Sequence, residues 1–279
     1  MCKVRSILEE IFLCKRPSHA HVVCAGFIPG LVKALYYEWY FAVSGKENES
    51  WFYDSPLSDK GRQQSEGVQK YLQSPAEYML PKEQEYLSLL KGTLNKENTV
   101  NSQLVSSPLR RATATMAVGL SDRFSKALPD DKMVLLPCLQ EISFNPDALC
   151  ITQPHAKVLP AWMDPPVVGP IYDKQTDSRL YTGNKPVNGK GIDRLNEFCK
   201  LAFTEFAGKD AIIAAGHSLW FRSFFRTYLP HGSTHISKQK KLINGGLVGF
   251  TFQRLKDPET GDFHYMIDPT SITTLHGGF

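Results

Sequence analysis

The stretch Val105-Ser106-Ser107-Pro108-Leu109-Arg110-Arg111-Ala112 combines the end of an apolar run, a short turn and the beginning of a helical pattern. The first amides of a helix have no partner within the helix, and the helix dipole is positive there. Two arginines at that end are unfavourable unless an anion accompanies them, and a guanidinium group offers a planar fork that matches phosphate. The stretch therefore predicts an anion site where a strand passes into a helix.

The pattern on both sides of this stretch alternates short apolar runs with amphipathic segments. Strands are predicted at Thr99–Ser106, Met133–Leu136 and Ala211–Ala215, and helices at Pro108–Leu128, Gly191–Ala207 and Ser218–Tyr228. Such alternation is typical of a mostly parallel sheet with helices on both faces. We therefore expect an α/β fold, built as a three-layer sandwich, with its ligand site beyond the carboxyl ends of the strands.

The remaining segments complete one expected domain over residues 1–279. Its N-terminal part, residues 1–50, is divergent or incomplete, and residues 140–190, rich in Pro, Asp, Gly and Asn, form a loop insertion. Long loops in compact domains are usually functional. The patterns outside the central region predict helices at Ser6–Leu13, Gly30–Val43 and Ser58–Leu72, irregular backbone at Lys15–Gly26, and a late strand pair at Leu247–Leu255 and Phe263–Ile267.

Composition narrows the function classes. The chain has 42% hydrophobic and 22% charged residues and a net charge of +4, so nucleic acid is not an expected partner. No apolar run is long enough for a membrane span, and no secretory signal is recognisable. We expect a cytoplasmic protein with mostly reduced cysteines and no stable membrane insertion.

No cofactor or metal is expected. The chain contains neither a dinucleotide-binding nor a Walker motif. Four residues, Cys14, His19, His21 and Cys24, are of the types that ligate zinc, but their spacing matches no common zinc pattern.

Two further residues are candidates for chemistry beside Ser107, Arg110 and Arg111, the candidate phosphate-binding residues. His217 follows the Ala211–Ala215 run, where a side chain can face a ligand, and Glu141 follows the Met133–Leu136 run, where a carboxyl group can act as a general acid. Each has a structural alternative: a histidine satisfied by backbone partners and a solvated loop glutamate.

A different reading assigns the chemistry to Ser218. Gly216-His217-Ser218-Leu219-Trp220 is close to the nucleophile elbow of serine hydrolases, with Asp257 or Asp268 and His264 or His276 as later partners. Trp220 stands where this strained turn needs a small residue.

Taken in order, the motifs resemble those of the histidine phosphatase superfamily, which is also called phosphoglycerate mutase-like. Asp54-Ser55-Pro56-Leu57-Ser58-Asp59-Lys60-Gly61 resembles its D-x-P-L-T-x-x-G segment, and the Ser106–Ala112 stretch with Thr115 resembles S-S-x-L-x-R-A-x-x-T. Leu139-Gln140-Glu141 resembles the acid segment, and Gly216-His217-Ser218 the second-histidine segment. The resemblance implies a phosphate-binding Arg111, a pocket histidine at 217 and a candidate acid at Glu141.

One motif of that family has no counterpart. In the family a phosphohistidine forms within Arg-His-Gly, and no arginine in this chain is directly followed by histidine. We expect residues Met1–Arg5 to replace the strand that carries this nucleophile. Three readings follow: an N-terminally incomplete phosphomonoester hydrolase, a pseudophosphatase that binds a phosphorylated small molecule or phosphoprotein, and a hydrolase that uses Ser218. The sequence leaves the substrate and the oligomeric state open.

Overall fold

The computed structural model describes residues 20–50, 52–74, 79–93, 101–128, 130–143, 145–186 and 188–279, and the backbone alone for residues 20–28 and 47. The expected helix at Ser6–Leu13, the segment Met1–Arg5 and the side chains of the Cys14–Cys24 group lie outside this description. Among the described residues, no helix combines the length and the apolar character that a membrane span requires.

The chain divides into two compact units, Met1–Phe52 and Tyr53–Phe279. The boundary falls next to the end of the divergent residues 1–50. In the first unit, helix α2 (Ala20–Val43) is followed by the short 3₁₀ helix η2 (Glu47–Glu49). The prediction of irregular backbone at Lys15–Gly26 is wrong from Ala20 onward, where the backbone is already helical. The hydroxyl of Ser50 donates to Glu38 Oε2 at 2.7 Å and fixes the turn after the helix.

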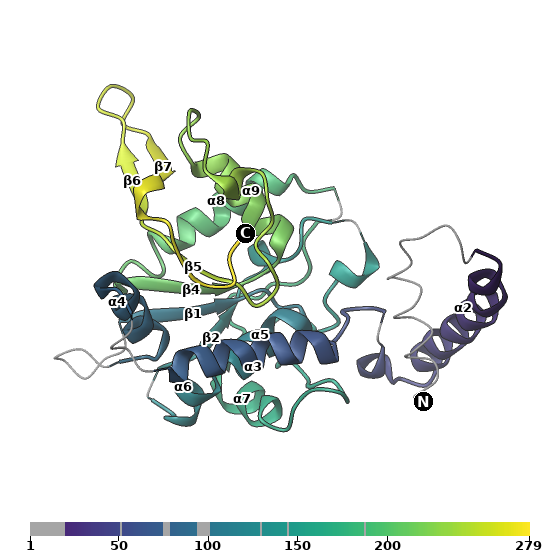
Figure 1. The fold of residues 1–279 in the computed structure, drawn as a ribbon. Coiled ribbons are helices and arrows are strands. Elements are labelled where there is room, and N and C mark those ends of the chain that lie inside the picture. Colours follow the sequence, from purple (N-terminus) through teal and green to yellow (C-terminus); the bar gives the residue numbers. More distant parts are fainter. Residues whose placement is uncertain are drawn as a thin grey trace. The chain divides into compact units, whose positions relative to one another are not determined.

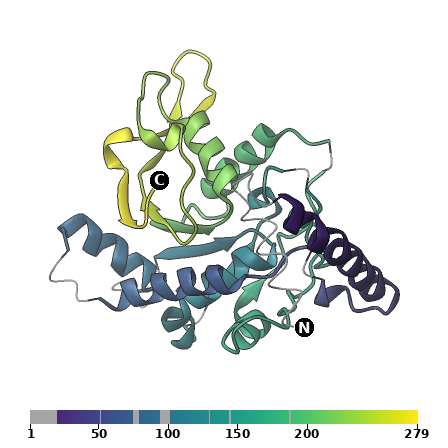
Figure 2. The same cartoon turned by 45° about the vertical axis from the view of Figure 1, so that its right-hand side comes forward.

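The second unit is built on a parallel sheet (Figures 1 and 2). Within the described residues its four strands run in the order β3-β2-β1-β4. They are β1 (Ser102–Ser106), β2 (Met133–Leu135), β3 (Thr176–Asp177) and β4 (Ala211–Ala215), and every neighbouring pair is parallel. The expectation of an α/β protein with a parallel sheet is confirmed.

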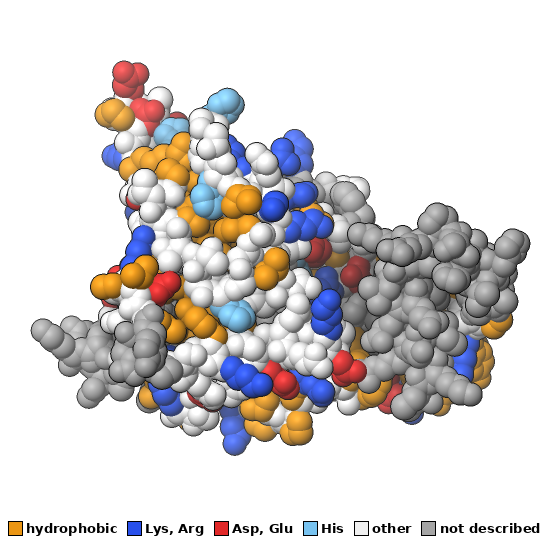
Figure 3. All heavy atoms as spheres, in the orientation of Figure 1, with side chains coloured by type: hydrophobic (Ala, Val, Ile, Leu, Met, Phe, Trp, Pro, Cys, Tyr) orange, Lys and Arg blue, Asp and Glu red, His pale blue; other side chains and the backbone are white. Residues whose placement is uncertain are grey.

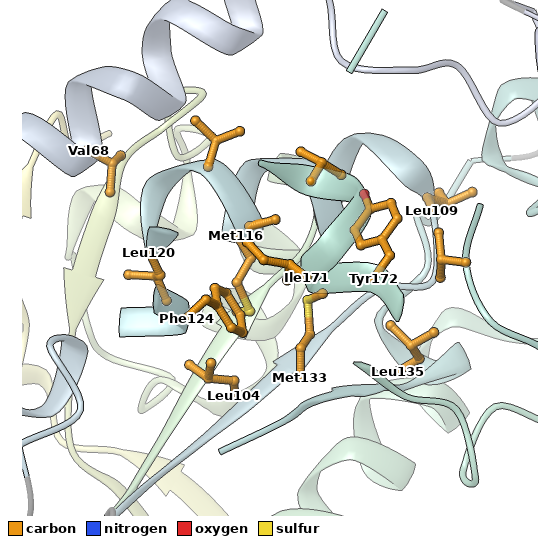
Figure 4. Packing of buried hydrophobic residues seen from close by; sticks show 14 of the residues in the cluster. Val68, Leu104, Leu109, Met116, Leu120, Phe124, Met133, Leu135, Ile171 and Tyr172 are labelled. Carbon is orange, nitrogen blue, oxygen red and sulfur yellow. The ribbon is translucent and has the colours of Figure 1, made fainter. Parts of the chain in front are cut away.

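Alternate residues of the strands supply two hydrophobic cores, because successive side chains of a strand point to opposite faces. Leu104, Met133 and Leu135 belong to the core on one face, and Val105 and Val134 to the core on the other. Figure 4 shows the first core, in which Met116, Leu120, Phe124 and Tyr172 pack with Leu104 and Met133. Helices therefore cover both faces of the sheet.

The first core takes its helical side chains from the elements α3 (Asp59–Gln73), α4 (Pro81–Leu90), α5 (Arg110–Gly119), α6 (Ser121–Ser125) and α7 (Val168–Gln175). The second core takes them from α8 (Gly191–Ala202) and α9 (Ser218–Tyr228). Gly119 lets α5 approach α3 closely, since a Cβ atom at this position would lie 3.2 Å from Val68 Cγ1. These helices leave the carboxyl ends of β1 and β4 available for a site.

Two expected helices are shorter than predicted. The helix predicted over Pro108–Leu128 is broken at Leu120, whose φ of −109° and ψ of 23° end α5 before α6 begins. The helix that begins at Gly191 ends at Ala202 rather than at Ala207.

The segment 140–190, expected to be a loop, contains regular structure. It follows the 3₁₀ helix η4 (Pro137–Leu139) and includes η5 (Pro146–Ala148), α7 and the edge strand β3. Val168 and Tyr172 of α7 are buried in the first core. Part of the insertion is therefore core structure.

The predicted strand Leu247–Leu255 is two strands. β5 (Leu247–Gly249) pairs antiparallel with β8 (Thr273–His276), and β6 (Phe252–Lys256) pairs antiparallel with β7 (Phe263–Ile267) as expected. Thr251 marks the change of partner: its amide donates to Ser271 Oγ at 2.7 Å and its carbonyl accepts from Asp268 N at 3.1 Å.

Two 3₁₀ helices complete the unit, η6 (Ile236–Lys238) and η7 (Pro269–Ser271). Hydrophobic side chains gather over the β6–β7 hairpin on the face drawn in Figure 3, and Leu255 and Phe263 of this hairpin are exposed.

Candidate functional site

A cavity of about 400 Å³ opens at the carboxyl ends of β1 and β4. Arg111, Glu141 and His217 all line it, although they are far apart in the sequence. Ser218 and Lys60 line it as well. The cavity lies where parallel α/β sheets usually bind ligands, because the loops after neighbouring strands meet at that edge.

His217 is buried at the step from β4 to α9. It is the N-cap residue of α9, and its side chain makes no capping hydrogen bond. Its Nε2 lies 2.9 Å from the hydroxyl of Ser107, the residue that follows β1. The strands hold this pair in place, since Ser107 N donates to Ala215 O at 2.9 Å.

The electrostatic surroundings keep the imidazole of His217 neutral. Burial lowers its pKa well below the ordinary value, and the nearby positive charges of Arg111, Lys185 and Arg194 lower it further. A neutral ring has one N–H donor and one acceptor. His217 can thus donate a hydrogen bond to an anion without carrying a charge of its own.

Arg111 is the second residue of α5 and is partly exposed to the cavity. Its Nη1 donates to the carbonyl of Asp147 at 2.7 Å, and its Nη2 lies 3.8 Å from the carboxylate of Asp147. Asp147 belongs to η5, so the insertion between β2 and α8 orients this arginine. A guanidinium group has five N–H donors, and these contacts with Asp147 involve two of them. Three further N–H groups are left for the paired hydrogen bonds by which a guanidinium fork binds an anion.

Glu141 lies two residues after the end of η4, on a backbone held by two cations. The Nζ of Lys185 donates to the carbonyls of Glu141 and Ser143, and Arg194 Nη1 donates to the carbonyl of Gln140 at 2.7 Å. The carboxylate of Glu141 accepts the amide of Ile142 at 2.8 Å. Its position in the cavity therefore depends on Lys185 and Arg194.

Lys185 and Arg194 were not predicted from the sequence. Burial, and next the neighbouring Arg194, lower the pKa of Lys185 to about 8. Burial also lowers the pKa of Arg194. The only signal in the sequence was that both lie in or next to the insertion; nothing in it indicates that they converge on the backbone at Glu141.

Two of the predicted phosphate-binding residues do not line the cavity. Arg110 is buried: its Nε donates to the carbonyl of Asp54 at 2.8 Å, and Nη2 donates to the carbonyl of Tyr53 at 3.2 Å. Ser107 is fully buried behind His217 and orients the ring. Adjacent residues of a helix point in directions about 100° apart, so Arg111 lines the cavity while Arg110 does not. Ser107 precedes the helix and contacts His217 instead of lining the cavity.

Asp54, from the D-x-P-L segment, holds the start of α5 in place. Its Oδ1 accepts the amide of Arg110 at 2.8 Å, and Oδ2 accepts the amide of Ile151 at 3.2 Å. Burial raises the pKa of this carboxyl, while the hydrogen bond from the Arg110 amide and the charge of Arg110 oppose that shift. Asp54 thus caps the first turn of α5 from a distant part of the chain, and its φ of 46° lies in the left-handed region.

Ser218 is the first residue of α9, and within the described residues its hydroxyl makes no hydrogen bond with a histidine. His264 and Asp257, offered as its partners, face each other on the β6–β7 hairpin with 3.6 Å between Nε2 and Oδ2. His276 lies on β8, where its ring packs 5.3 Å from that of Tyr71. In the part of the chain that the structure describes, Ser218 is not joined to these histidines and acids by a chain of hydrogen bonds.

Among the described residues, no group of three or more His, Cys, Asp and Glu side chains is arranged to hold a metal ion. Comparison with models of known protein families gives no match for this chain, and comparison with curated proteins gives none either.

Proposed function

We propose that this protein binds the phosphoryl group of a phosphorylated small molecule or phosphoprotein in the cavity at the ends of β1 and β4. The observation that carries the proposal is the convergence of Arg111, Glu141 and His217 on one cavity. The same three residues are the ones that the resemblance to histidine phosphatases assigns to phosphate binding, pocket histidine and acid.

The physical chemistry of the cavity suits a phosphate dianion. Arg111 offers a guanidinium fork, and the N-terminal residues His217 and Ser218 of α9 line the cavity at a helix end where the side chain of His217 makes no capping hydrogen bond. Arg111, Lys185 and Arg194 all act on His217 as positive charges, and Glu141 and Asp147 bring negative charge to the same region. A bound anion would gain from the positive charges nearest to it.

Hydrolysis of a phosphomonoester requires a nucleophile in line with the leaving group, besides binding and an acid. The chain has no Arg-His-Gly motif to supply it. We therefore assign binding to the residues described here, and hydrolysis to this protein only if another group replaces that nucleophile. If no group replaces it, the protein is a pseudophosphatase, which binds the phosphoryl group without hydrolysing the ester.

Calorimetric titration of the full chain with orthovanadate and with inorganic phosphate tests the pocket. We expect Arg111→Ala to weaken binding at least tenfold, since a charge-assisted hydrogen bond contributes about 1.5–3 kcal/mol. Arg226→Ala is the matched control, because Arg226 is exposed on the same unit and outside the cavity. Binding that Arg111→Ala leaves unchanged contradicts the proposal.

The same preparations assayed with p-nitrophenyl phosphate separate the two outcomes. Turnover that is lost in Arg111→Ala and His217→Gln indicates a working phosphatase with a replaced nucleophile. Tight vanadate binding without turnover indicates a pseudophosphatase.

A further inference from the structure

Among the described residues, no strand pairs with the edge of β4 that faces away from β1. Within the described part of the chain, β4 pairs with β1 alone, and the bond from Ser107 N to Ala215 O fixes which residues face that partner. In a parallel pair, alternate residues turn both N–H and C=O toward the same neighbour. Ala211, Ile213 and Ala215 face β1, so Ile212 and Ala214 direct their backbone groups to the other edge, where no described strand pairs with them.

This edge borders the cavity. Ile213, Ala214 and Ala215 line it from β4, and Leu247 lines it from β5, a strand whose pairing within the described residues is with β8 alone. In Figure 1, β5 is drawn next to β4. All five residues of β4 are half-buried, whereas Leu104 and Val105 of β1 are fully buried. β4 has the exposure of a strand that lacks a neighbour.

Apolar side chains line the cavity on both faces of the sheet, with the polar side chains of Gln64, Ser65 and Thr115 among them on the side of α3 and α5. Val68, Met116 and Leu120 belong to the first core, and Phe221 packs against the second. A strand covered on both faces is typically a continuous run of apolar residues. An occupant that pairs with β4 must therefore be extended and apolar on both sides.

The charge at one end of the cavity sets the direction of such an occupant. Arg111 and Lys60 line the cavity together with Glu141 and the N-terminus of α9. The described strands of this sheet are parallel, so an added parallel strand brings its carboxyl end to Gly216 and His217. An anionic residue there meets the positive groups, whereas an antiparallel strand would bring its amino end to them.

We propose that the free edge of β4 is a strand-addition site for an extended peptide of a partner protein. The peptide is apolar over about five residues, which matches the length of β4 at roughly 3.3 Å per residue, and it ends in an anionic residue. This proposal rests on the proposed function in one respect only, the preference for a phosphate group on the anionic residue at the carboxyl end of the peptide.

The probe is the hexapeptide acetyl-Thr-Val-Ile-Val-Val-phosphoserine amide, added to the full chain, with amide hydrogen exchange followed residue by residue. We expect the amides of Ile212 and Ala214 to exchange at least tenfold more slowly with the peptide. The Ile213 amide, which faces β1, serves as the internal control and changes little. Absence of protection at residues 212 and 214 in the presence of 1 mM peptide overturns the proposal. Protection before the peptide is added also overturns it, since another segment or a second copy then covers the edge.

Two matched pairs isolate the backbone pairing. Ile212→Pro removes an N–H that does not serve the β1 ladder, and Ile212→Ala removes the same side-chain packing but keeps the N–H. We expect at least a tenfold loss of peptide affinity for the proline variant relative to the alanine variant. Peptides with every second amide N-methylated, in the two possible phases, test the same bonds without altering the protein. If both bind as tightly as the parent, there is no edge pairing.

A peptide that ends in alanine separates this proposal from the proposed function. If the phosphate pocket is absent, phosphoserine and alanine peptides bind equally, but both still protect residues 212 and 214. If the strand site is absent, neither peptide protects these amides, while vanadate continues to bind.

Discussion

At the scale of single residues, Arg110 and Arg111 are neighbours in one helix but have different surroundings: the side chain of Arg110 is buried against Asp54 and Tyr53, whereas Arg111 lines the cavity. Local pattern places both arginines at the start of one helix. The different roles of the two arginines depend on Asp54, which lies 56 positions before Arg110. The carboxylate of Asp54 accepts the amide of Arg110, and the carbonyl of Asp54 accepts a hydrogen bond from the Arg110 side chain. Such a distant partner leaves no trace in local periodicity. Glu141 and His217 were candidates because each lies a few residues after a predicted strand, Met133–Leu136 and Ala211–Ala215.

His217 should make stability depend on pH. Its pKa in the folded protein is well below the ordinary value of 6.5, because burial and neighbouring cations disfavour the charged ring. Below about pH 6.5 the unfolded chain therefore binds one more proton than the folded chain, and stability falls with decreasing pH by up to about 1.4 kcal/mol per unit. We expect His217→Gln to flatten this dependence between pH 6.5 and 5, as measured by urea unfolding. Equal slopes for both proteins would falsify the assignment.

Asp54 should be among the most sensitive positions in the second unit. Asp54→Ala leaves the buried Arg110 without its carboxylate and removes acceptors of two backbone amides. Breaking a buried pair in this way costs roughly 3–5 kcal/mol. Equilibrium denaturation measures the loss. Asp173→Ala, which removes an exposed partner of Lys157, is the control and should leave the midpoint almost unchanged.

At the scale of elements, the sequence predicted what local pattern encodes and missed what tertiary contacts decide. The run Ala211–Ala215 is apolar and short, and it forms β4 within its predicted bounds. Helix α7 was hidden because its surroundings are rich in proline and glycine, and it is held by the burial of Val168, Ile171 and Tyr172 in the first core. The predicted strand over Leu247–Leu255 splits because Thr251 bonds with the segment between β7 and β8, a partner that no local pattern reveals.

The contact between α4 and β5 gives a test at this scale. A Cβ atom at Gly249 of β5 would lie 2.7 Å from the ring of Tyr86 in α4. We expect Gly249→Ala to destabilise the protein by about 1–3 kcal/mol, the usual cost of overpacking. Gly208→Ala is the matched control, because a Cβ at Gly208 has no neighbour within 4 Å. If the two variants unfold at the same urea concentration, the packing of Tyr86 on Gly249 is not as described.

At the scale of the whole molecule, the two compact units differ in how they bury hydrophobic residues. Among the described residues, all members of both hydrophobic cores belong to the second unit, beginning with Val68. The candidate phosphate pocket and the free edge of β4 also belong to that unit. A domain with its own core is expected to fold by itself.

We therefore expect a chain that begins at Tyr53 to fold cooperatively and to bind vanadate as the full chain does. Its Tm should differ from that of the second unit's transition in the full chain by less than about 3 °C, which corresponds to roughly 1 kcal/mol or less for a domain of this size. Thermal unfolding followed by circular dichroism and the vanadate titration measure the two properties separately. A shortened chain that folds but no longer binds vanadate would assign part of the anion site to residues 1–52. The shortened chain still contains both hydrophobic cores and every pocket residue. If it does not fold, the second unit depends on residues 1–52 for its stability.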